Sequence, residues 1–182
     1  MISFKNIQID ENVNLGALTT MQIGGGARYL TKVKTVEQIR EALDFAKSEN
    51  LPIFVLGSGS NTIVHDEGFA GLVIKNEILG REMVSEDAET KTFKIGAGEI
   101  WDEFCQWAVR DQQLSGCEAM VMIPGTVGAL PVQNVGAYGQ ETVNIFAGCE
   151  ALNLETGELE ILSAEDCKLG YRSSIFREEA LG

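Results

Sequence analysis

Apolar and polar residues alternate with a helical period in the first third of the chain. The apolar positions recur every three or four residues, at Val36, Ile39, Leu43 and Ala46, as in an amphipathic helix. Thr35 and Gln38 stand at the two ends of a capping-box pattern, which predicts that the helix begins at Thr35. Asn50-Leu51-Pro52 predicts its end, because proline disfavours a helical conformation in the residue before it.

A short all-apolar run, Ile53-Phe54-Val55-Leu56, follows this helix directly. Such a run is typical of a strand that is buried on both faces. A helix that leads into a strand of this kind predicts a parallel or mixed sheet. We expect residues 29–33 and 72–74 to supply its neighbouring strands.

The second half of the chain predicts another helix and a hairpin. After Gly98 the apolar residues again recur at helical spacing, at Trp101, Phe104, Cys105, Ala108 and Val109. We expect this stripe to face a core and the helix to stop near Gly116. Residues 149–154 and 159–162 flank Glu155-Thr156-Gly157-Glu158, which is typical of a β-hairpin. The composition predicts two lobes, residues 1–78 and 79–182.

The charge of the chain narrows the classes of partner. Its 182 residues carry a formal net charge of −13, which argues against nucleic acid or an anionic membrane, because both need a basic footprint on the protein. The acidic residues 85–89 we interpret as a solvated loop. A bound phosphate is still compatible with this charge. Screening confines the global field to about 8 Å at physiological salt, whereas each N–H directed at an anion contributes about 1.5–3 kcal/mol.

The sequence indicates neither a targeting segment nor a metal site. Residues 1–6 lack the apolar core of a signal peptide, and no apolar run reaches the roughly 18 residues that a membrane span needs, so we expect a cytoplasmic protein. The four cysteines are scattered and His65 is the single histidine. Since this spacing fits neither a zinc site nor a disulfide framework, we expect buried free thiols, a solvated His65 and no metal.

A glycine-rich turn, Gly57-Ser58-Gly59-Ser60-Asn61, follows the predicted buried strand. Consecutive N–H groups in such a turn form a concave anion site, and serine and asparagine side chains add donors. A Rossmann fingerprint would need a third glycine and an immediate helix, but Thr62-Ile63-Val64 continues as an apolar, strand-like run. A P-loop would need Gly-Lys-Ser/Thr, and this turn has no lysine. Neither motif fits.

A second glycine-rich segment spans residues 123–141. Four glycines (Gly125, Gly128, Gly136, Gly139) and two prolines (Pro124, Pro131) fall within it, a spacing that neither helix nor strand propensity produces. Its small polar residues, Thr126, Gln133 and Asn134, can donate to phosphates or to the edge of a planar ring. One such segment fits an irregular loop packed on a core. Two in a short chain favour one extended ligand that carries phosphate.

An arginine in the segment 170–177 is the third candidate. Arg172 follows Tyr171 and precedes two serines, where it can bind a carboxylate or stabilise an anionic intermediate. Because the chain has 27 acidic residues, the spacing by itself favours a surface ion pair for Arg172.

These segments together resemble the UDP-N-acetylenolpyruvoylglucosamine reductase family, also called UDP-N-acetylmuramate dehydrogenase. Residues 56–61 with 66–74 resemble its first FAD-binding signature, residues 123–141 its second, and residues 170–176 its third. Residues 95–101 also match. The likeness runs in matching order from about Leu18 to the end of the sequence.

The resemblance implies an α+β fold, a two-lobed FAD-binding domain of the vanillyl-alcohol oxidase (PCMH) type. Residues 1–78 would be FAD-binding lobe 1 and residues 79–182 lobe 2. It also implies a cytoplasmic flavoprotein oxidoreductase of peptidoglycan synthesis, which serves cell wall biogenesis, cell shape and cell division. In this family NADPH reduces FAD, and the reduced flavin passes hydride to the enolpyruvyl group of UDP-N-acetylglucosamine-enolpyruvate.

The same resemblance implies two groups of cofactor-binding residues. The first wraps the pyrophosphate: Gly57, Ser58, Gly59, Ser60 and Asn61. The second lines the flavin ring and the ribityl chain: Pro124, Gly125, Thr126, Gly128, Gln133, Asn134, Gly136, Ala137 and Tyr138. Arg172 matches the family's catalytic arginine, which stabilises the enolate-like intermediate, and Tyr171 lies on the substrate side.

The family pattern also extends beyond this sequence. The family uses a serine proton donor and a glutamate partner for the arginine, both in later sequence, and the serine belongs to a substrate-binding domain. We therefore expect the lobes to be C-terminally incomplete, this substrate-binding domain to be absent, and the 182 residues to be inactive alone. We also expect an open sheet edge through which the chain self-associates.

Two alternatives stay open at this point. The chain can be a non-catalytic FAD- or nucleotide-binding module, or another flavin oxidoreductase of the same superfamily. One departure from the family is Leu130, which stands where a small residue is usual and which we expect to crowd the flavin.

Overall fold

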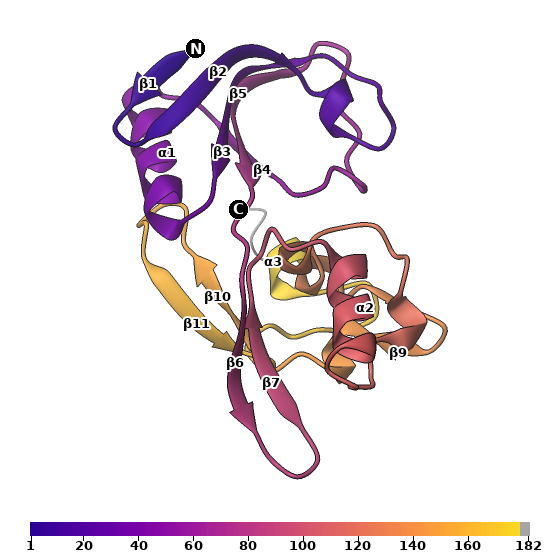
Figure 1. Ribbon diagram of the computed structural model, residues 1–182. Coiled ribbons are helices and arrows are strands. Elements are labelled where there is room, and N and C mark those ends of the chain that lie inside the picture. The colour runs from indigo at the N-terminus through magenta and orange to yellow at the C-terminus, as the bar shows by residue number, and fades with distance from the viewer. Residues whose placement is uncertain (179–182) are drawn as a thin grey trace. The chain divides into compact units, whose positions relative to one another are not determined.

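The computed structural model describes residues 1–178 and divides into two compact units, Met1–Ile78 and Leu79–Gly182. Figure 1 shows the helices and strands of both units. The expectation that the lobes are C-terminally incomplete concerns the chain beyond residue 178, which lies outside the described residues.

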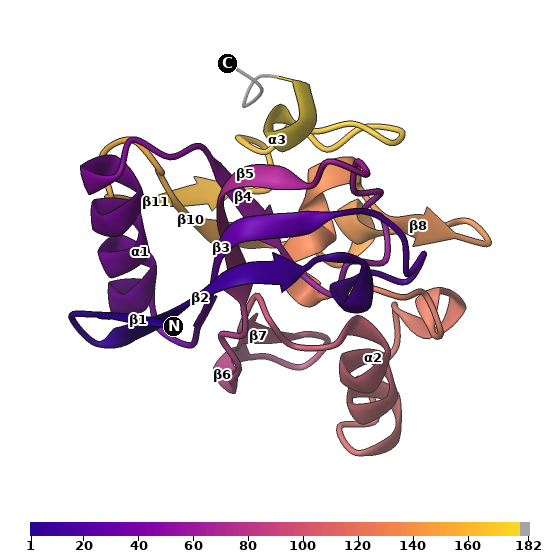
Figure 2. The ribbon, with the colours of Figure 1, turned by 90° about the horizontal axis from the view of Figure 1, so that it is seen from above.

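The first unit is built on a five-stranded mixed sheet. Its strands are β1 (Ile2–Phe4), β2 (Ile7–Asn14), β3 (Gly26–Val33), β4 (Ile53–Leu56) and β5 (Phe69–Asn76), in the order β1-β2-β3-β5-β4. The β1–β2 and β2–β3 pairs are antiparallel, whereas β3 and β4 both pair with β5 in parallel. Figure 2 shows β2, β3 and β5 running side by side. The prediction of a mixed sheet with strands at 29–33 and 72–74 is confirmed.

The predicted amphipathic helix is also confirmed, as α1 (Val36–Ser48). The Thr35 hydroxyl accepts the Gln38 N–H at 3.2 Å, and the side-chain oxygen Oε1 of Gln38 accepts the backbone N–H of Lys34 at 2.7 Å. Both bonds satisfy donors that the helix itself leaves unpaired. The capping box therefore forms, with its return bond shifted by one residue to Lys34.

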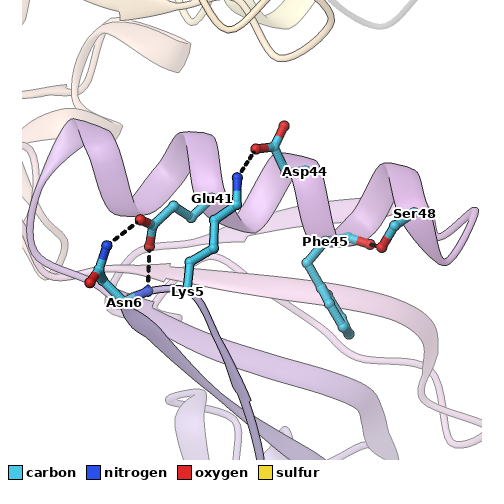
Figure 3. Close-up of polar contacts among 6 residues, drawn as sticks. All are labelled: Lys5, Asn6, Glu41, Asp44, Phe45 and Ser48. Atoms are coloured by element: carbon cyan, nitrogen blue, oxygen red, sulfur yellow. Dashed lines mark hydrogen bonds and ion pairs between the residues drawn. The ribbon is translucent and has the colours of Figure 1, made fainter.

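One face of α1 packs on the sheet while its other face binds the β1–β2 turn. Ala42, Phe45 and Ala46 are buried in one core cluster with residues of β2, β3 and β5. Figure 3 shows Phe45 directed toward the sheet and the Glu41 carboxylate accepting both the backbone N–H and the side-chain amide of Asn6, at 3.0 and 2.6 Å. The helix and the turn thus fix one another's position.

The prediction that Ile53–Leu56 is buried on both faces is wrong. Phe54 is 36% exposed and Val55 is 47% exposed. The reason is topological, because among residues 1–178 β4 lies at the end of the strand order and pairs with β5 alone. An edge strand has a neighbouring strand on one side only, so an all-apolar run does not by itself show that a strand lies in the centre of a sheet.

The second unit consists of short hairpins and irregular turns around one helix. Its elements are β6 (Arg81–Glu86), β7 (Lys91–Ile95), α2 (Trp101–Arg110), β8 (Gly136–Ala137), β9 (Gln140–Glu141), β10 (Gly148–Leu152), β11 (Leu159–Ser163) and α3 (Ile175–Glu178). The predicted hairpin at 149–162 is confirmed as β10 and β11, which pair antiparallel. Residues 85 and 86, expected in a loop, belong to β6, and the turn follows them.

The core of the second unit forms along α2, as the stripe predicted. Trp101, Cys105 and Ala108 are buried with Met120 and Leu130, and the indole N–H of Trp101 donates to the Met120 carbonyl at 2.9 Å. The helix ends at Arg110, earlier than expected from Gly116. The Leu114 N–H bonds back to the Ala108 carbonyl around Gln113, whose φ is 56°, and this closes the helix.

The four thiols are free, as expected, and three of them are buried: Cys105, Cys117 and Cys167. Cys149 is half-buried, and its sulfur lies 3.9 Å from that of Cys167. Burial raises the pKa of Cys149 to about 12, so its reactive thiolate form is scarce near neutral pH. His65 is exposed, also as expected.

Candidate functional site

The turn at residues 57–61 leaves the end of β4 and folds back on the first unit. Gly59 is buried with a φ of +73°, and a Cβ at this position would lie 2.2 Å from the Leu18 carbonyl oxygen. The Gly59 carbonyl also accepts the N–H of Thr20 at 3.1 Å. Only glycine fits this combination of backbone conformation and close approach. The turn is therefore held in one shape by its contact with residues 18–20.

The donors of this turn are available to a ligand. Within residues 1–178, the backbone N–H groups of Ser58, Gly59, Ser60 and Asn61 donate to no other residue. The Ser58 hydroxyl donates to that of Ser60 at 3.3 Å, and Asn61 is exposed. Unpaired, partly buried N–H groups are unfavourable unless water or a ligand satisfies them. Such a row of donors matches the oxygens of a diphosphate.

The chain after this turn forms neither a strand nor a helix. The expectation that residues 62–64 continue as a strand is wrong, because they are irregular. The Rossmann fingerprint is still excluded, since no helix opens at the turn.

One cation lies at this turn that was not predicted from the sequence, Lys75. The ammonium of Lys75, on β5, donates to the Gly57 carbonyl at 3.1 Å. Lys75 is paired in register with Leu56, the last residue of β4. The parallel pairing of β4 and β5 brings Lys75 to the start of the turn. The register of this pairing cannot be read from the sequence alone, so the contact could not be predicted.

The glycine-rich segment of the second unit is joined to the loop that precedes α2. The N–H groups of Val127 and Gly128 donate to the carbonyls of Glu99 and Ala97, both at 2.9 Å. A Cβ on Gly128 would lie 2.6 Å from the Ala97 Cβ. These contacts explain the glycine at position 128, because the two backbones approach too closely for any side chain.

An ion pair anchors the loop before α2. The Arg81 guanidinium donates twice to the Glu99 carboxylate, at 2.8 and 2.7 Å, and the Gly80 N–H donates to the same group at 2.9 Å. Partial burial pushes the pKa of Glu99 upward, but the hydrogen bonds from Gly80 and Arg81 outweigh it and hold this pKa below its usual value. Glu99 is therefore a structural anion in the second unit.

Asn134 organises the second half of the segment from inside. It is 1% exposed. Its amide nitrogen donates to the Glu141 carboxylate and to the Gly170 carbonyl, each at 2.9 Å, while its oxygen accepts the Val143 N–H at 3.0 Å. The side chain thus joins three backbone segments, and its backbone takes a left-handed φ of 45°. Gln133 is half-buried and Tyr138 is 95% exposed.

Leu130 lies in the core of the second unit, where it is 6% exposed and packs in the cluster of Trp101 and Met120. The leucine side chain therefore fills space in the core of the second unit.

Arg172 lies at the tip of a tight turn that reaches this segment. The N–H and carbonyl groups of Gly170 and Ser173 bond reciprocally, at 3.1 and 3.2 Å, and Arg172 has a φ of 52°. Its guanidinium donates to the Gly136 carbonyl at 3.0 Å. Within residues 1–178 it forms no ion pair, so the ion pair that spacing favoured is not seen there. Tyr171, beside it, is 85% exposed.

The second unit therefore brings three of the candidate residues together, Asn134, Gly136 and Arg172. Residues 57–61 belong to the first unit. Among residues 1–178 no group of three or more histidine, cysteine or acidic side chains is arranged to hold a metal ion. In the same range no helix has the length and apolar content of a membrane span.

Two units of mixed α and β structure, each with a glycine-rich loop, define an FAD-binding fold of the vanillyl-alcohol oxidase type. Its solved neighbours include 6-hydroxy-D-nicotine oxidase from Arthrobacter nicotinovorans, which is 17% identical with a TM-score of 0.65 over 90% of this chain and 37% of that one. At this identity the likeness shows the fold alone. The chain belongs to the FAD binding domain family, whose model matches residues 27–163.

The more similar relatives agree with the resemblance drawn from the sequence. A protein of Pseudomonas putida named UDP-N-acetylenolpyruvoylglucosamine reductase is 42% identical over 171 residues, which are 94% of this chain and 50% of the relative. The crystal structure of the reductase from Thermus caldophilus is 30% identical with a TM-score of 0.72, over 92% of this chain and 57% of that one. The resemblance is confirmed, and the chain spans about half the length of the curated relatives it matches.

Proposed function

We propose that this chain is the FAD-binding part of an oxidoreductase that reduces UDP-N-acetylglucosamine-enolpyruvate to UDP-N-acetylmuramate with NADPH. The observation that carries the proposal is the similarity to reductases of this name along almost the whole chain, at 36–42% identity. The physical support is the row of unbonded N–H groups at residues 58–61, which suits the diphosphate of FAD. Peptidoglycan synthesis in the cytoplasm is the setting that this function implies.

The residues divide between the two parts of the cofactor. Residues 57–61 would hold the pyrophosphate, and Pro124 to Gly128 with Gln133, Asn134 and Gly136 to Tyr138 would line the flavin ring and ribityl chain. The bound FAD would supply the hydride chemistry by accepting electrons from NADPH and delivering them to the enolpyruvyl group. At residues 58–61 the unbonded backbone N–H groups would face the ligand, whereas the Gly128 N–H is already bonded to the Ala97 carbonyl.

Arg172 would act on the substrate side of this site. Its guanidinium can pair with the substrate carboxylate and stabilise negative charge that develops during reduction. The turn from Gly170 to Ser173 limits the positions that Arg172 can take. Asn134 supports that turn through the Gly170 carbonyl. The chain thus orients a cation before any substrate arrives, which reduces the reorganisation needed at the moment of reaction.

A flavin reconstitution experiment tests the proposal. The purified chain is incubated with FAD and freed of excess ligand, and its visible absorption spectrum is recorded before and after NADPH is added without oxygen. We expect a bound flavin spectrum that NADPH bleaches. Binding without bleaching would favour a non-catalytic FAD module, or a flavin oxidoreductase with another electron donor. A folded chain that takes up no FAD would contradict the proposal.

A matched pair of glycine variants locates the site. Gly59→Ala places a Cβ against the Leu18 carbonyl, whereas Gly80→Ala adds one where nothing lies within 4 Å, and both glycines have a positive φ. We expect Gly59→Ala to abolish FAD uptake and Gly80→Ala to retain it. Circular dichroism of both variants checks that loss of uptake is not loss of fold.

A further inference from the structure

Lys75 is a cation that the first unit places at the beginning of the glycine-rich turn. Its ammonium lies 3.1 Å from the Gly57 carbonyl, and this is its single hydrogen bond within residues 1–178. An ammonium carries three donors. Two N–H donors of Lys75 are therefore left for water or a ligand next to the unbonded N–H groups of residues 58–61.

The strand β5 directs this side chain to the face of the sheet that carries the turn. Leu72 and Ile74 lie in the core cluster under α1, while Val73 lies in the other cluster with Leu30 and Leu56. Because successive side chains of a strand point to opposite faces, Lys75 shares the face of Val73 and points away from α1. Its pairing with Leu56 sets it level with the point where β4 enters the turn.

The charge of Lys75 is uncompensated in a strongly acidic chain. Two other lysines of this unit pair with carboxylates, Lys5 with Asp44 and Lys32 with Glu77. Lys34 and Lys47 form no ion pair within residues 1–178 either, but both are exposed, whereas Lys75 is half-buried. Within residues 1–178 Lys75 has no such partner, although the sequence contains 27 acidic residues against 14 basic ones. A half-buried lysine that has no carboxylate partner and lies beside unbonded N–H groups is typical of a site that receives an anion.

We propose that Lys75 binds the diphosphate of the ligand held by residues 57–61 and makes the turn selective for a diphosphate-bearing flavin over riboflavin. The inference rests on the proposed function, because it takes that turn to be the pyrophosphate site of FAD. Its physical basis is that a charged donor next to neutral N–H donors strengthens anion binding in a partly desolvated site. The turn itself, Gly-Ser-Gly-Ser-Asn, contains no cation, and Lys75 supplies one from the neighbouring strand.

Lys75 could instead serve only to bind the Gly57 carbonyl and so support the turn. The two roles differ in their ligand dependence. Support of the turn would affect every ligand and the stability of the free protein, whereas anion binding affects only ligands that carry phosphate. The comparison of FAD with riboflavin therefore separates them.

Dissociation constants of FAD and riboflavin, measured by fluorescence at two salt concentrations, test the proposal on the full chain and its variants. We expect Lys75→Met to weaken FAD about tenfold, to leave riboflavin unchanged and to reduce the salt dependence of FAD binding. Lys75→Arg should restore most of the affinity. Lys47→Met, which removes the same charge from α1 on the opposite face of the sheet, should bind FAD like the wild type.

The possible results separate the inference from the proposed function. Equal weakening of FAD and riboflavin, with a lower melting temperature of the free protein, would overturn the inference, and so would unaltered FAD affinity in Lys75→Met. If the chain takes up no FAD, calorimetry with inorganic pyrophosphate tests whether Lys75 binds a diphosphate. Pyrophosphate binding that Lys75→Met weakens would support the inference while the proposed function fails. A wild-type chain that binds neither FAD nor pyrophosphate would overturn both.

Discussion

At the scale of single residues, Asn134 has a position that the sequence identifies as unusual and contacts that the sequence does not predict. The sequence identifies it as a polar residue in an unusual glycine-rich segment, and its resemblance-based role as a cofactor ligand stays a prediction. The structure shows that its buried side chain forms three hydrogen bonds, with the Glu141 carboxylate, the Val143 N–H and the Gly170 carbonyl. These partners could not be read from the sequence, because a side-chain bond across 36 positions has no local signal.

We expect Asn134→Ala to destabilise the second unit by about 2–4 kcal/mol. The variant leaves the Val143 N–H without its partner and removes one of the two hydrogen bonds to the Gly170 carbonyl, which keeps the bond from the Ser173 N–H, and alanine disfavours the left-handed φ of this position. Denaturant unfolding of the chain measures the change. Gln133→Ala is the control, since the neighbouring side chain makes no such bonds within residues 1–178, and it should change stability by less than about 0.5 kcal/mol. Equal stability of the two variants would contradict this role of Asn134.

At the scale of elements, the strongly periodic segments are predictable and the polar ones are not. The stripes of α1 and α2 and the apolar runs of β3 and β5 show in the sequence because burial selects them. The hairpin of β6 and β7 does not show, since β6 is mostly exposed and lacks apolar alternation. The ends of this hairpin are tied by the ion pairs of Arg81 with Glu99 and of Lys91 with Glu86, and only the folded chain reveals these pairings.

The anchor between β6 and the loop before α2 predicts a specific pH dependence. Because the pKa of Glu99 is lower in the folded chain than its usual value near 4.5, the carboxylate contributes stability that is fully present above pH 4.5. This contribution is lost as the pH falls through the folded-state pKa. We expect Glu99→Gln to lower stability at pH 7, and the difference from the wild type to shrink below pH 4.5.

Thermal unfolding of both proteins between pH 3 and pH 7 measures this difference. Glu103→Gln, on the exposed side of α2, controls for the loss of one negative charge. If the difference between Glu99→Gln and the wild type stayed constant over this range, Glu99 would not be the titrating anchor.

At the scale of the whole molecule, the division into units follows from where the core clusters form. Two clusters lie within residues 1–78, on opposite faces of the sheet, and the third lies within residues 79–178 around α2. The fold class was predictable, since family signatures and helical stripes identify it. The backbone hydrogen bonds that join one loop to another could not be predicted, because these contacts depend on register and close approach.

The expected self-association through an open sheet edge stays a prediction, and the structure offers one strand for it. The edge strand β4 exposes Phe54 and Val55, and within residues 1–178 one row of its backbone groups pairs with no strand. We expect a concentration-dependent rise in molecular mass by light scattering, which Val55→Lys reduces. Ile63→Lys places the same charge on an exposed apolar residue outside the strands and should leave association unchanged. A wild-type chain that is monomeric at all concentrations would contradict the prediction.

The connection between β4 and β5 has a consequence for the rate at which the first unit opens. Parallel neighbours are usually joined through a helix, but here residues 57–68 cross over as an irregular loop that includes the glycine-rich turn. Such long-range parallel pairing forms slowly, and loop contacts made after the folding transition state govern unfolding more than folding. A ligand held by this crossover is then expected to lengthen the lifetime of the native state while it leaves the folding rate nearly unaltered.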